Sequence, residues 1–221
     1  MSTALQLADW RLRWQVFRCR RKSDTKTAFL LELARCVARA PRDRAAPPLL
    51  EIGTRSGGSA LLMVRVLADM YRGYAPPPLV LTVDPYGARP YEGASFVYDD
   101  RHYATMKRAL AKYANHVHYM MDSALFLREL NHLSLWSGGV QRPLDRFTLV
   151  YLDGSHDPDI VWHEVEQLRP RVVPGGFLIV DDTDWFGGEV RRRLDAAAAR
   201  TGFAVRHNGK QSIIEPFRLP P

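Results

Sequence analysis

The sequence predicts an α/β fold: a mostly parallel sheet with helices on both faces and an antiparallel hairpin at its C-terminal end. Two observations lead to this prediction. From residue 49 onward, short apolar segments of strand length alternate with longer segments of helical periodicity, which is typical of parallel strands joined by helices. Further along, two strand-like segments flank Asn208-Gly209, a common hairpin turn. Five parallel strands and this hairpin make a seven-stranded sheet.

The first 45 residues predict a helical extension in front of an α/β domain that covers residues 46–221. In the first helix Trp10, Trp14 and Phe17 recur at i, i+4 and i+7 and form an apolar stripe, with arginines on much of the remaining surface. Such a stripe could dock on the domain, cover a substrate cleft, contact a second subunit in a homodimer or lie on a membrane surface. A second helix is expected over 27–40.

The elements of the α/β domain follow in order along the chain. Strands are expected at 49–53, 79–84, 117–121, 147–153, 177–180, 203–206 and 212–215. Helices are expected at 59–71, 100–113, 124–132, 160–168 and 188–200. The long stretch 87–103 is expected to form a lid or substrate loop. Aromatic side chains that could stack on a planar or sugar-bearing substrate are Tyr86, Tyr91, Phe96, Tyr98 and Trp185.

The bulk composition excludes several classes of protein. No apolar run reaches the roughly 18 residues that span a bilayer, and the N-terminus lacks the layout of a secretory signal. The two cysteines, Cys19 and Cys36, make a disulfide framework or a cysteine-ligated metal site unexpected, which favours a cytoplasmic protein. The net charge of +7 leaves nucleic acid open as a partner.

A glycine turn follows the first strand and opens a helix. It runs from Gly53 through Thr54 and Arg55 to Gly57, with Glu51 before it and Ser59 after it. Glycine lets a backbone approach a ligand closely, and a helix N-terminus attracts a carboxylate. The methionine end of S-adenosylmethionine (SAM) carries a carboxylate, which Ser59 and nearby amides could hold, and an ammonium, which Glu51 could accept. The alternative is a tight turn without a ligand.

Polar residues also follow the next two strands. Asp84 ends the second strand, where an acid can accept hydrogen bonds from both hydroxyls of a ribose. Asp122 and Ser123 follow the third, where a fold of this type would place a polar side chain at the edge of an adenine. Each acid could instead have a purely structural role and bind no ligand: Asp84 could cap a turn, and Asp122 could cap the following helix.

Three carboxylates follow the next pair of strands. Asp153 ends one strand, and Asp181 and Asp182 end its neighbour after a single helical crossover. Parallel strands bring these ends together, and adjacent carboxylates repel one another unless a cation or protons intervene. Oxygen ligands without cysteine suit Mg²⁺, or Mn²⁺ or Ca²⁺. Alternatively, the acids bond to backbone amides. His156 could act as a general base; otherwise it is a surface or capping histidine.

These motifs together resemble the SAM-dependent O-methyltransferases, in particular the metal-dependent group that includes the catechol and caffeoyl-CoA enzymes. The resemblance covers roughly residues 48–215 and rests on LLEIGTRSGGSALL, LVLTVDPYG, VYLDGSHD and PGGFLIVDDTDW. It departs in three places. Arg55 stands where many members have glycine, and His156 takes the place of the catalytic lysine. Asp182 replaces a usual Asn, as in the macrocin O-methyltransferases.

The resemblance implies a class I methyltransferase sheet that binds SAM through the glycine turn and holds Mg²⁺ on Asp153, Asp181 and Asp182. The implied activity is Mg-assisted transfer of a methyl group to a hydroxyl of a small molecule, such as a natural product or sugar-bearing metabolite. Asp153 and His156 are then the expected catalytic residues. In this mechanism Mg²⁺ would bind the oxygen of the acceptor hydroxyl and lower the pKa of that hydroxyl.

Other functions would use the same fold. The positive charge is compatible with an RNA ribose methyltransferase, although Asp153-Gly154-Ser155-His156 differs from the D/N-P-P-Y/F/W motif of enzymes that methylate base amino groups. A non-catalytic SAM-binding protein is a further alternative, but the acids would then destabilise the fold without a ligand. An NAD-linked enzyme is disfavoured by the missing middle glycine and by the terminal hairpin.

Overall fold

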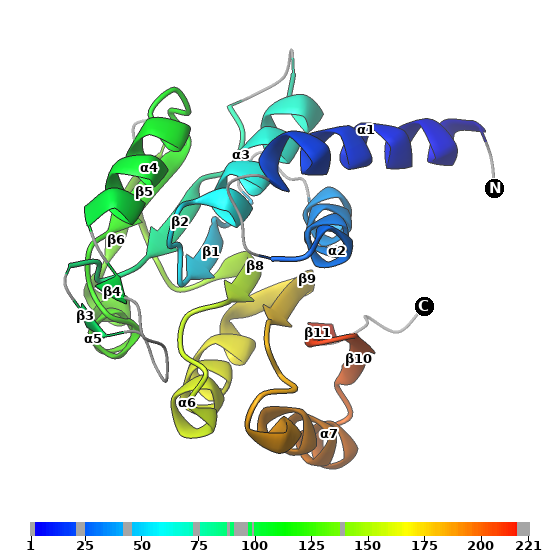
Figure 1. Cartoon of the computed structure of the whole chain (residues 1–221), viewed down its shortest axis with the longest axis vertical. Helices are drawn as coiled ribbons and strands as arrows, with labels where there is room; N and C mark the ends of the chain where they lie inside the picture. The colour runs from blue at the N-terminus through cyan, green and yellow to red at the C-terminus, as the bar shows by residue number, and fades with distance from the viewer. Residues whose placement is uncertain are drawn as a thin grey trace.

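A seven-stranded sheet in the order β10-β11-β9-β8-β1-β2-β5 forms the centre of the protein (Figure 1). The computed structural model describes residues 3–20, 25–41, 46–72, 76–87, 89–90, 97–98, 100–137 and 140–215. Strand β11 runs antiparallel to both of its neighbours, and the other six strands share one direction. The strands are β1 (Leu49–Ile52), β2 (Val80–Val83), β5 (His116–Tyr119), β8 (Phe147–Leu152), β9 (Val172–Val180), β10 (Ala204–Asn208) and β11 (Gln211–Glu215).

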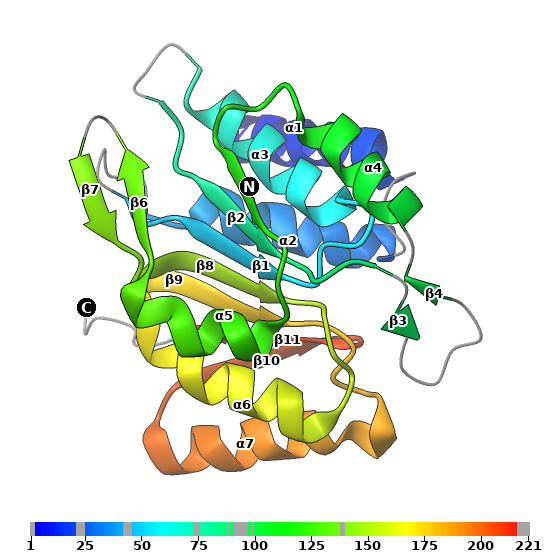
Figure 2. The ribbon, with the colours of Figure 1, turned by 90° about the vertical axis from the view of Figure 1, so that its left-hand side faces the viewer.

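Helices cover both faces of this sheet (Figure 2). One face carries α1 (Thr3–Cys19), α2 (Thr27–Arg39), α3 (Gly58–Met70) and α4 (Asp100–Leu110). The opposite face carries α5 (Ser123–Glu129), α6 (Pro158–Leu168) and α7 (Glu189–Thr201). Short 3₁₀ turns are η2 (Leu130–His132), η3 (Arg169–Arg171) and η4 (Phe186–Gly188), and two small hairpins pair β3 (Arg89–Pro90) with β4 (Val97–Tyr98) and β6 (Ser134–Ser137) with β7 (Val140–Pro143).

The alternation of side chains along the strands explains the two hydrophobic cores. In β1 and β8, Leu49 and Leu149 point into the core beneath α2 and α3, whereas Leu50 and Val150 point into the core beneath α6 and α7. All residues of β1, β2 and β8 are buried, as expected for parallel strands that are covered on both faces.

The α/β fold with a C-terminal antiparallel hairpin is the fold that the sequence predicted, and three local details differ. The small hairpins β3–β4 and β6–β7 were not expected. Strand β9 begins at Val172, before the glycines at 175 and 176, and its pairing with β8 shifts register between Phe147 and Leu149. The C-terminal hairpin turns at Gly209-Lys210, because Asn208 still pairs with Gln211. Much of the proposed lid, including Tyr91 and Phe96, lies outside the described residues.

Helix α1 has two apolar faces. Val16 and Cys19 are buried against the core beneath α2 and α3. The predicted aromatic stripe lies on the other side, where Trp10 is 63% exposed and stacks on Trp14, which stacks on Phe17. The stripe therefore does not dock on the domain. Among the described residues, no helix combines the length and apolar character needed to cross a membrane.

Candidate active site

Four residues that the sequence singled out lie side by side at one edge of the sheet, each directly after a strand. The amide of Asp181 donates to the carbonyl of Leu152, and the amide of Asp153 donates to that of Ile52. In the same way Gly53 bonds to Val83 and Asp84 bonds to Tyr119, with N–O distances of 2.8–3.2 Å across the four bonds. The backbone ladder therefore aligns Asp181, Asp153, Gly53 and Asp84 in this order.

The glycine turn packs directly on the chain that follows β8. Gly53 has a φ of +88°, and a Cβ atom at this position would lie 2.1 Å from the carbonyl oxygen of Asp153. Gly57 has a φ of +78° and precedes the first residue of α3. Both the conformation and the close approach at residue 53 require glycine. Arg55 adopts a φ of +45°, so it takes a conformation that glycine usually supplies.

The carboxylate of Asp84 holds the glycine turn in place through hydrogen bonds to backbone amides. Its Oδ2 accepts hydrogen bonds from the amides of Thr54 and Arg55, both at 2.9 Å, and its Oδ1 accepts one from the amide of Tyr86 at 3.1 Å. The Tyr86 hydroxyl in turn donates to the carbonyl of Arg55. Asp84 is thus a structural residue of the turn; its predicted contact with a ribose stays a prediction.

Glu51 lies fully buried beside the turn. The Ser59 hydroxyl donates to its Oε1, whereas its Oε2 makes no hydrogen bond to the described residues. Burial raises the pKa of Glu51 to about 8; the Ser59 hydrogen bond opposes the shift, and the charge of Asp84 adds to it. A buried carboxylate with one unpartnered oxygen suits a cationic group of a ligand.

Asp122 caps α5, as one of its two sequence interpretations expected. Its side chain accepts a hydrogen bond from the amide of Leu125 at 2.8 Å, and Ser123 is the first residue of the helix. This capping places both residues beyond the end of β5, next to the edge where Asp84 lies. A contact with adenine, the other interpretation, stays a prediction.

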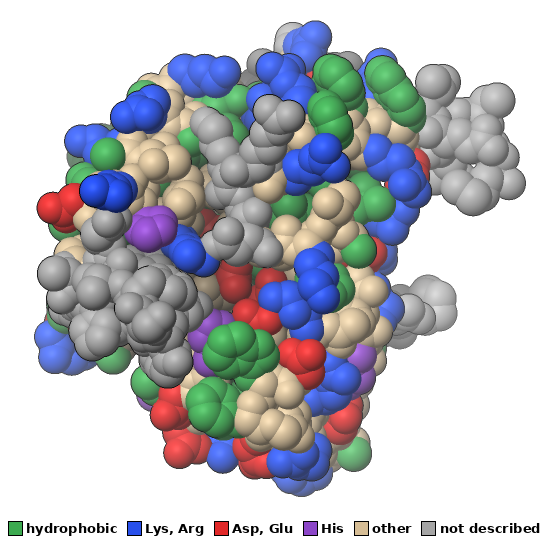
Figure 3. Space-filling view, viewed as in Figure 1, with side chains coloured by type: hydrophobic (Ala, Val, Ile, Leu, Met, Phe, Trp, Pro, Cys, Tyr) green, Lys and Arg blue, Asp and Glu red, His purple; other side chains and the backbone are tan. Residues whose placement is uncertain are grey.

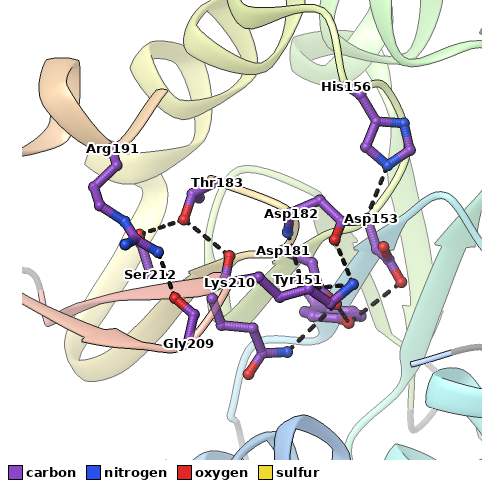
Figure 4. A network of polar contacts seen from close by, with 11 residues as sticks. Tyr151, Asp153, His156, Asp181, Asp182, Thr183, Arg191, Gly209, Lys210 and Ser212 are labelled. Carbon is purple, nitrogen blue, oxygen red and sulfur yellow. Dashed lines mark hydrogen bonds and ion pairs between the residues drawn. The ribbon is translucent and has the colours of Figure 1, made fainter. Parts of the chain in front are cut away.

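Asp153 and Asp181 share one neighbour, Tyr151 (Figure 4). The Tyr151 hydroxyl lies 2.7 Å from Oδ2 of Asp181 and 3.2 Å from Oδ2 of Asp153. Gln211 on β11 adds a weaker contact to the same Asp181 oxygen at 3.4 Å. The two carboxyl groups therefore converge at the sheet edge, beside the glycine turn.

Asp182 connects this pair to two further side chains. Its Oδ2 lies 3.0 Å from Nε2 of His156, and its Oδ1 contacts the ammonium of Lys210. Lys210 also lies 3.6 Å from Oδ1 of Asp181. The ring of His156 is buried and stacks on Trp185, with 4.0 Å between the ring centroids. We call Tyr151, Asp153, His156, Asp181, Asp182 and Lys210 the acid cluster.

The charges in the acid cluster shift one another's pKa. Burial, together with the charges of Asp181 and Asp182, holds the pKa of Asp153 well above its usual range. Burial would also raise the pKa of Asp182, but hydrogen bonds from His156 and Lys210 outweigh it and leave the pKa lowered. Burial would lower the pKa of Lys210, yet the charge of Asp181 and the contact with Asp182 raise it.

The acid cluster is only partly exposed, since the side chain of Lys210 is 22% exposed and that of Asp182 is 13% exposed, whereas that of Asp181 is fully buried. Figure 3 shows acidic side chains gathered in a recess near the middle of the face seen in Figure 1, with basic side chains beside them. Of the predicted aromatic residues near the site, Trp185 is half exposed, whereas Tyr86 is buried under the glycine turn. Tyr86 is therefore unavailable for stacking on a substrate in this arrangement.

The acid cluster is the place where the sequence predicts Mg²⁺. Three carboxylates provide the oxygen ligands that this ion prefers. In the described arrangement, however, Lys210 and His156 occupy both oxygens of Asp182, and Lys210 also approaches Asp181. Among the described residues, no group of three His, Cys, Asp or Glu side chains could hold a metal ion. The residues as arranged do not fit a divalent cation.

Sequence reasoning missed Tyr151, Lys210 and Gln211. Tyr151 lies in the middle of an apolar strand and reads as a core residue. Lys210 and Gln211 belong to the C-terminal hairpin, far from the acids in sequence. Only the place of β11 beside β9 in the sheet could have pointed to them, because it brings the hairpin to the end of the strand that carries Asp181.

The strand order, with its antiparallel hairpin, and the glycine turn after β1 define a class I SAM-dependent methyltransferase. Residues 50–183 match the model of a family described as a methyltransferase domain. This match covers more than half of the chain, and the chain belongs to that family. A search of curated proteins gave no match.

Solved structures share the fold at low sequence identity. A protein from Corynebacterium glutamicum is 14% identical with a TM-score of 0.64, over 93% of this chain and 91% of that one. The O-methyltransferase TomG from Streptomyces achromogenes, solved with SAM, is 17% identical with a TM-score of 0.56, over 93% and 89%. CalS11, a TDP-rhamnose 3′-O-methyltransferase, is 16% identical with a TM-score of 0.55, over 97% and 95%.

Proposed function

We propose that this protein transfers the methyl group of SAM to a hydroxyl group of a small molecule. The observation that carries the proposal is the contact between Gly53 and Asp153. A Cβ at residue 53 would lie 2.1 Å from the Asp153 carbonyl, so the glycine turn lies against the acid cluster, as a single site would require. A methyl donor held by the turn would then lie beside the groups that can bind an acceptor.

The residues of the turn have the chemistry to bind SAM. The unpartnered Oε2 of Glu51 would accept the ammonium, and the N-terminal amides of α3, that of Ser59 included, would hold the carboxylate. Asp84, which accepts hydrogen bonds from three amides of the turn, would also accept one from a ribose hydroxyl. Asp122 and Ser123 would lie at the adenine edge.

His156 and Asp153 would act on the acceptor. The acceptor oxygen attacks the methyl carbon, the carbon–sulfur bond breaks with its electron pair going to sulfur, and the hydroxyl proton moves to His156. Asp182, 3.0 Å from Nε2, would hold the imidazole in place. Asp153 would hydrogen-bond the acceptor. Alignment of donor and acceptor can lower the barrier by roughly 7–11 kcal/mol.

The acceptor class is proposed by analogy with structures of the same fold. TomG takes part in tomaymycin synthesis, and CalS11 methylates a nucleotide sugar in calicheamicin biosynthesis. In this protein Trp185, which stacks on His156, has a half-exposed ring that would pack on a planar or sugar ring of a hydroxylated metabolite.

The test combines cofactor binding with turnover. The full chain and the variants Glu51→Ala, Asp153→Asn and His156→Ala are titrated with SAM, and then assayed with labelled SAM against phenols, glycosides, nucleotide sugars and RNA. We expect Glu51→Ala to weaken SAM binding by tenfold or more. Asp153→Asn and His156→Ala should bind SAM normally and lose at least about 100-fold in turnover. Exposed Asp145→Asn is the control.

Two results would overturn the proposal. One is a wild-type protein that does not bind SAM. The other is turnover by Asp153→Asn and His156→Ala at the wild-type rate. If RNA is methylated in preference to every small acceptor, the acceptor is a nucleic acid and not a small molecule.

A further inference from the structure

We propose that Lys210 is the built-in cation of the acid cluster and excludes a divalent metal ion from it. The inference deepens the proposed function, because the acid cluster is the acceptor side of that site. It concerns the charge balance of Asp181 and Asp182, whose carboxylates would otherwise need an added cation.

The contacts of the Lys210 ammonium support this role. It contacts Oδ1 of Asp182 and lies 3.6 Å from Oδ1 of Asp181, so it bridges the two acids of the pair. A metal ion shared by this pair would need oxygens at the same place. The ammonium and a divalent cation therefore compete for the same position, and the side chain of Lys210 is only 22% exposed there.

The backbone around Lys210 is fixed, which distinguishes this lysine from a mobile surface residue. The carbonyl oxygen of Lys210 accepts hydrogen bonds from the amide of Thr183 at 2.8 Å and from its hydroxyl at 2.9 Å. The preceding Gly209 accepts a hydrogen bond from Arg191 through its carbonyl. Thr183 follows Asp182 directly in the chain, so the hairpin turn and the acid pair are tied together.

Helix α2 closes the other side of the hairpin turn. Gly209 has a φ of +58°, and a Cβ there would lie 2.9 Å from the ring of Phe29. The Lys210 ammonium lies 5.6 Å from the centroid of the same ring, a distance at which a cation is attracted to the face of an aromatic ring. The turn is thus held between α2 and the segment after β9, with Lys210 directed at the acids (Figure 4).

The experiment measures metal binding by the intact, full-length protein and needs no acceptor. Mn²⁺ binding is followed by electron paramagnetic resonance in wild type, Lys210→Met, Lys210→Arg and Lys112→Met, the last a control on exposed α4–β5 surface. We expect Lys210→Met to bind Mn²⁺ with a dissociation constant on the order of 10⁻⁴ M or lower. Wild type, Lys210→Arg and Lys112→Met should bind at least tenfold more weakly.

A second substitution locates the new site. Adding Asp181→Asn to Lys210→Met should abolish the gained Mn²⁺ binding, because it removes one of the two carboxylates that Lys210 bridges. Melting curves give an independent reading: 5 mM Mg²⁺ should raise the melting temperature of Lys210→Met and leave that of wild type unchanged.

The proposal fails if wild type binds Mn²⁺ as tightly as Lys210→Met, or if Lys210→Met gains no affinity. If Lys210→Met does not fold, the wild type and Lys210→Arg still test the proposal. A dissociation constant for Mn²⁺ on the order of 10⁻⁴ M in either protein would contradict it. These readouts are independent of methyl transfer, so a failure to find an acceptor would count against the proposed function alone.

Discussion

The backbone of Gly53 lies against the carbonyl group of Asp153, so that a single added methyl group would clash with it at 2.1 Å. This contact joins the turn after β1 to the acid that follows β8. Glycine is needed at residue 53 for two reasons: it can adopt a positive φ, and it has no side chain. The two reasons can be tested independently.

Gly53→Ala is expected to lower the free energy of unfolding by more than about 3 kcal/mol, since the clash adds to the cost of positive φ. Gly202→Ala is the matched control. Gly202 has a φ of +74°, and no atom lies within 4 Å of the place that an added methyl group would take, so its cost should be only about 1 kcal/mol. Urea denaturation measures both. Equal losses would mean that the contact with Asp153 is unimportant.

The raised pKa of Glu51 predicts a pH dependence of stability in the ligand-free protein. Its folded-state pKa is about 8, above the ordinary value of 4.5, so the folded protein holds a proton that the unfolded chain releases. Stability should therefore fall as the pH rises from about 5 to 8 and level off above 8.

The variant Glu51→Gln removes this titration and keeps an acceptor for Ser59. Relative to wild type it should gain stability by about 2–4 kcal/mol between pH 5 and pH 8. Urea denaturation at pH 5, 6.5, 8 and 9 checks the sign. A difference that stays constant with pH would contradict the shift.

Tyr151→Phe removes the hydroxyl that lies between Asp153 and Asp181. We expect a loss of about 1–3 kcal/mol in stability, because a carboxylate oxygen loses a buried partner. Tyr119→Phe is the comparison, since half-buried Tyr119 packs on Phe126 and should cost about 0.5 kcal/mol or less. If the two variants have the same stability, the Tyr151 hydroxyl does not support the acids.

The two faces of α1 should respond differently to truncation. Val16→Ala removes buried methyl groups and should cost about 1–2 kcal/mol, whereas Trp14→Ala on the exposed stripe should change stability by about 0.5 kcal/mol or less in dilute protein. Chemical denaturation at two protein concentrations measures both. Stability that rises with concentration in wild type but not in Trp14→Ala would support the homodimer predicted from the sequence.

If Lys210 supplies the charge, turnover should not need an added metal. Once an acceptor is known, wild-type methyl transfer should keep its rate in 5 mM EDTA, whereas Lys210→Met should lose most of its activity. A complete loss of wild-type activity in EDTA, restored by Mg²⁺, would favour the metal-dependent mechanism that the sequence resemblance implies.

The sequence predicted the row of site residues because strand ends can be read from one chain. Gly53, Asp84, Asp153 and Asp181 each follow an apolar segment, and parallel strands must bring such ends together. The partners of these residues were not predictable in the same way. Three backbone amides bind Asp84, and amides are present at nearly every residue, so no residue type signals this contact.

The position of Lys210 depends on tertiary packing rather than on local pattern. From the sequence, a lysine that follows Asn-Gly is expected to be a solvent-exposed turn residue. Its approach to Asp182 requires β11 to insert beside β9 and Phe29 on α2 to press on the turn. The exposed side of α1 was likewise unpredictable, because periodicity finds the stripe of Trp10, Trp14 and Phe17 but not which of two apolar faces meets the core.

The place of β11 between β9 and the edge strand β10 has a consequence for shortened versions of the protein. Its Ser212, Ile213 and Ile214 pair with β9, and β10 pairs only with β11. A chain cut before residue 204 would leave the apolar half of β9, from Phe177 to Val180, as an unprotected sheet border that can recruit another molecule. Such a fragment should aggregate. It would also lack Lys210, so Asp181 and Asp182 would lose the ammonium that bridges them.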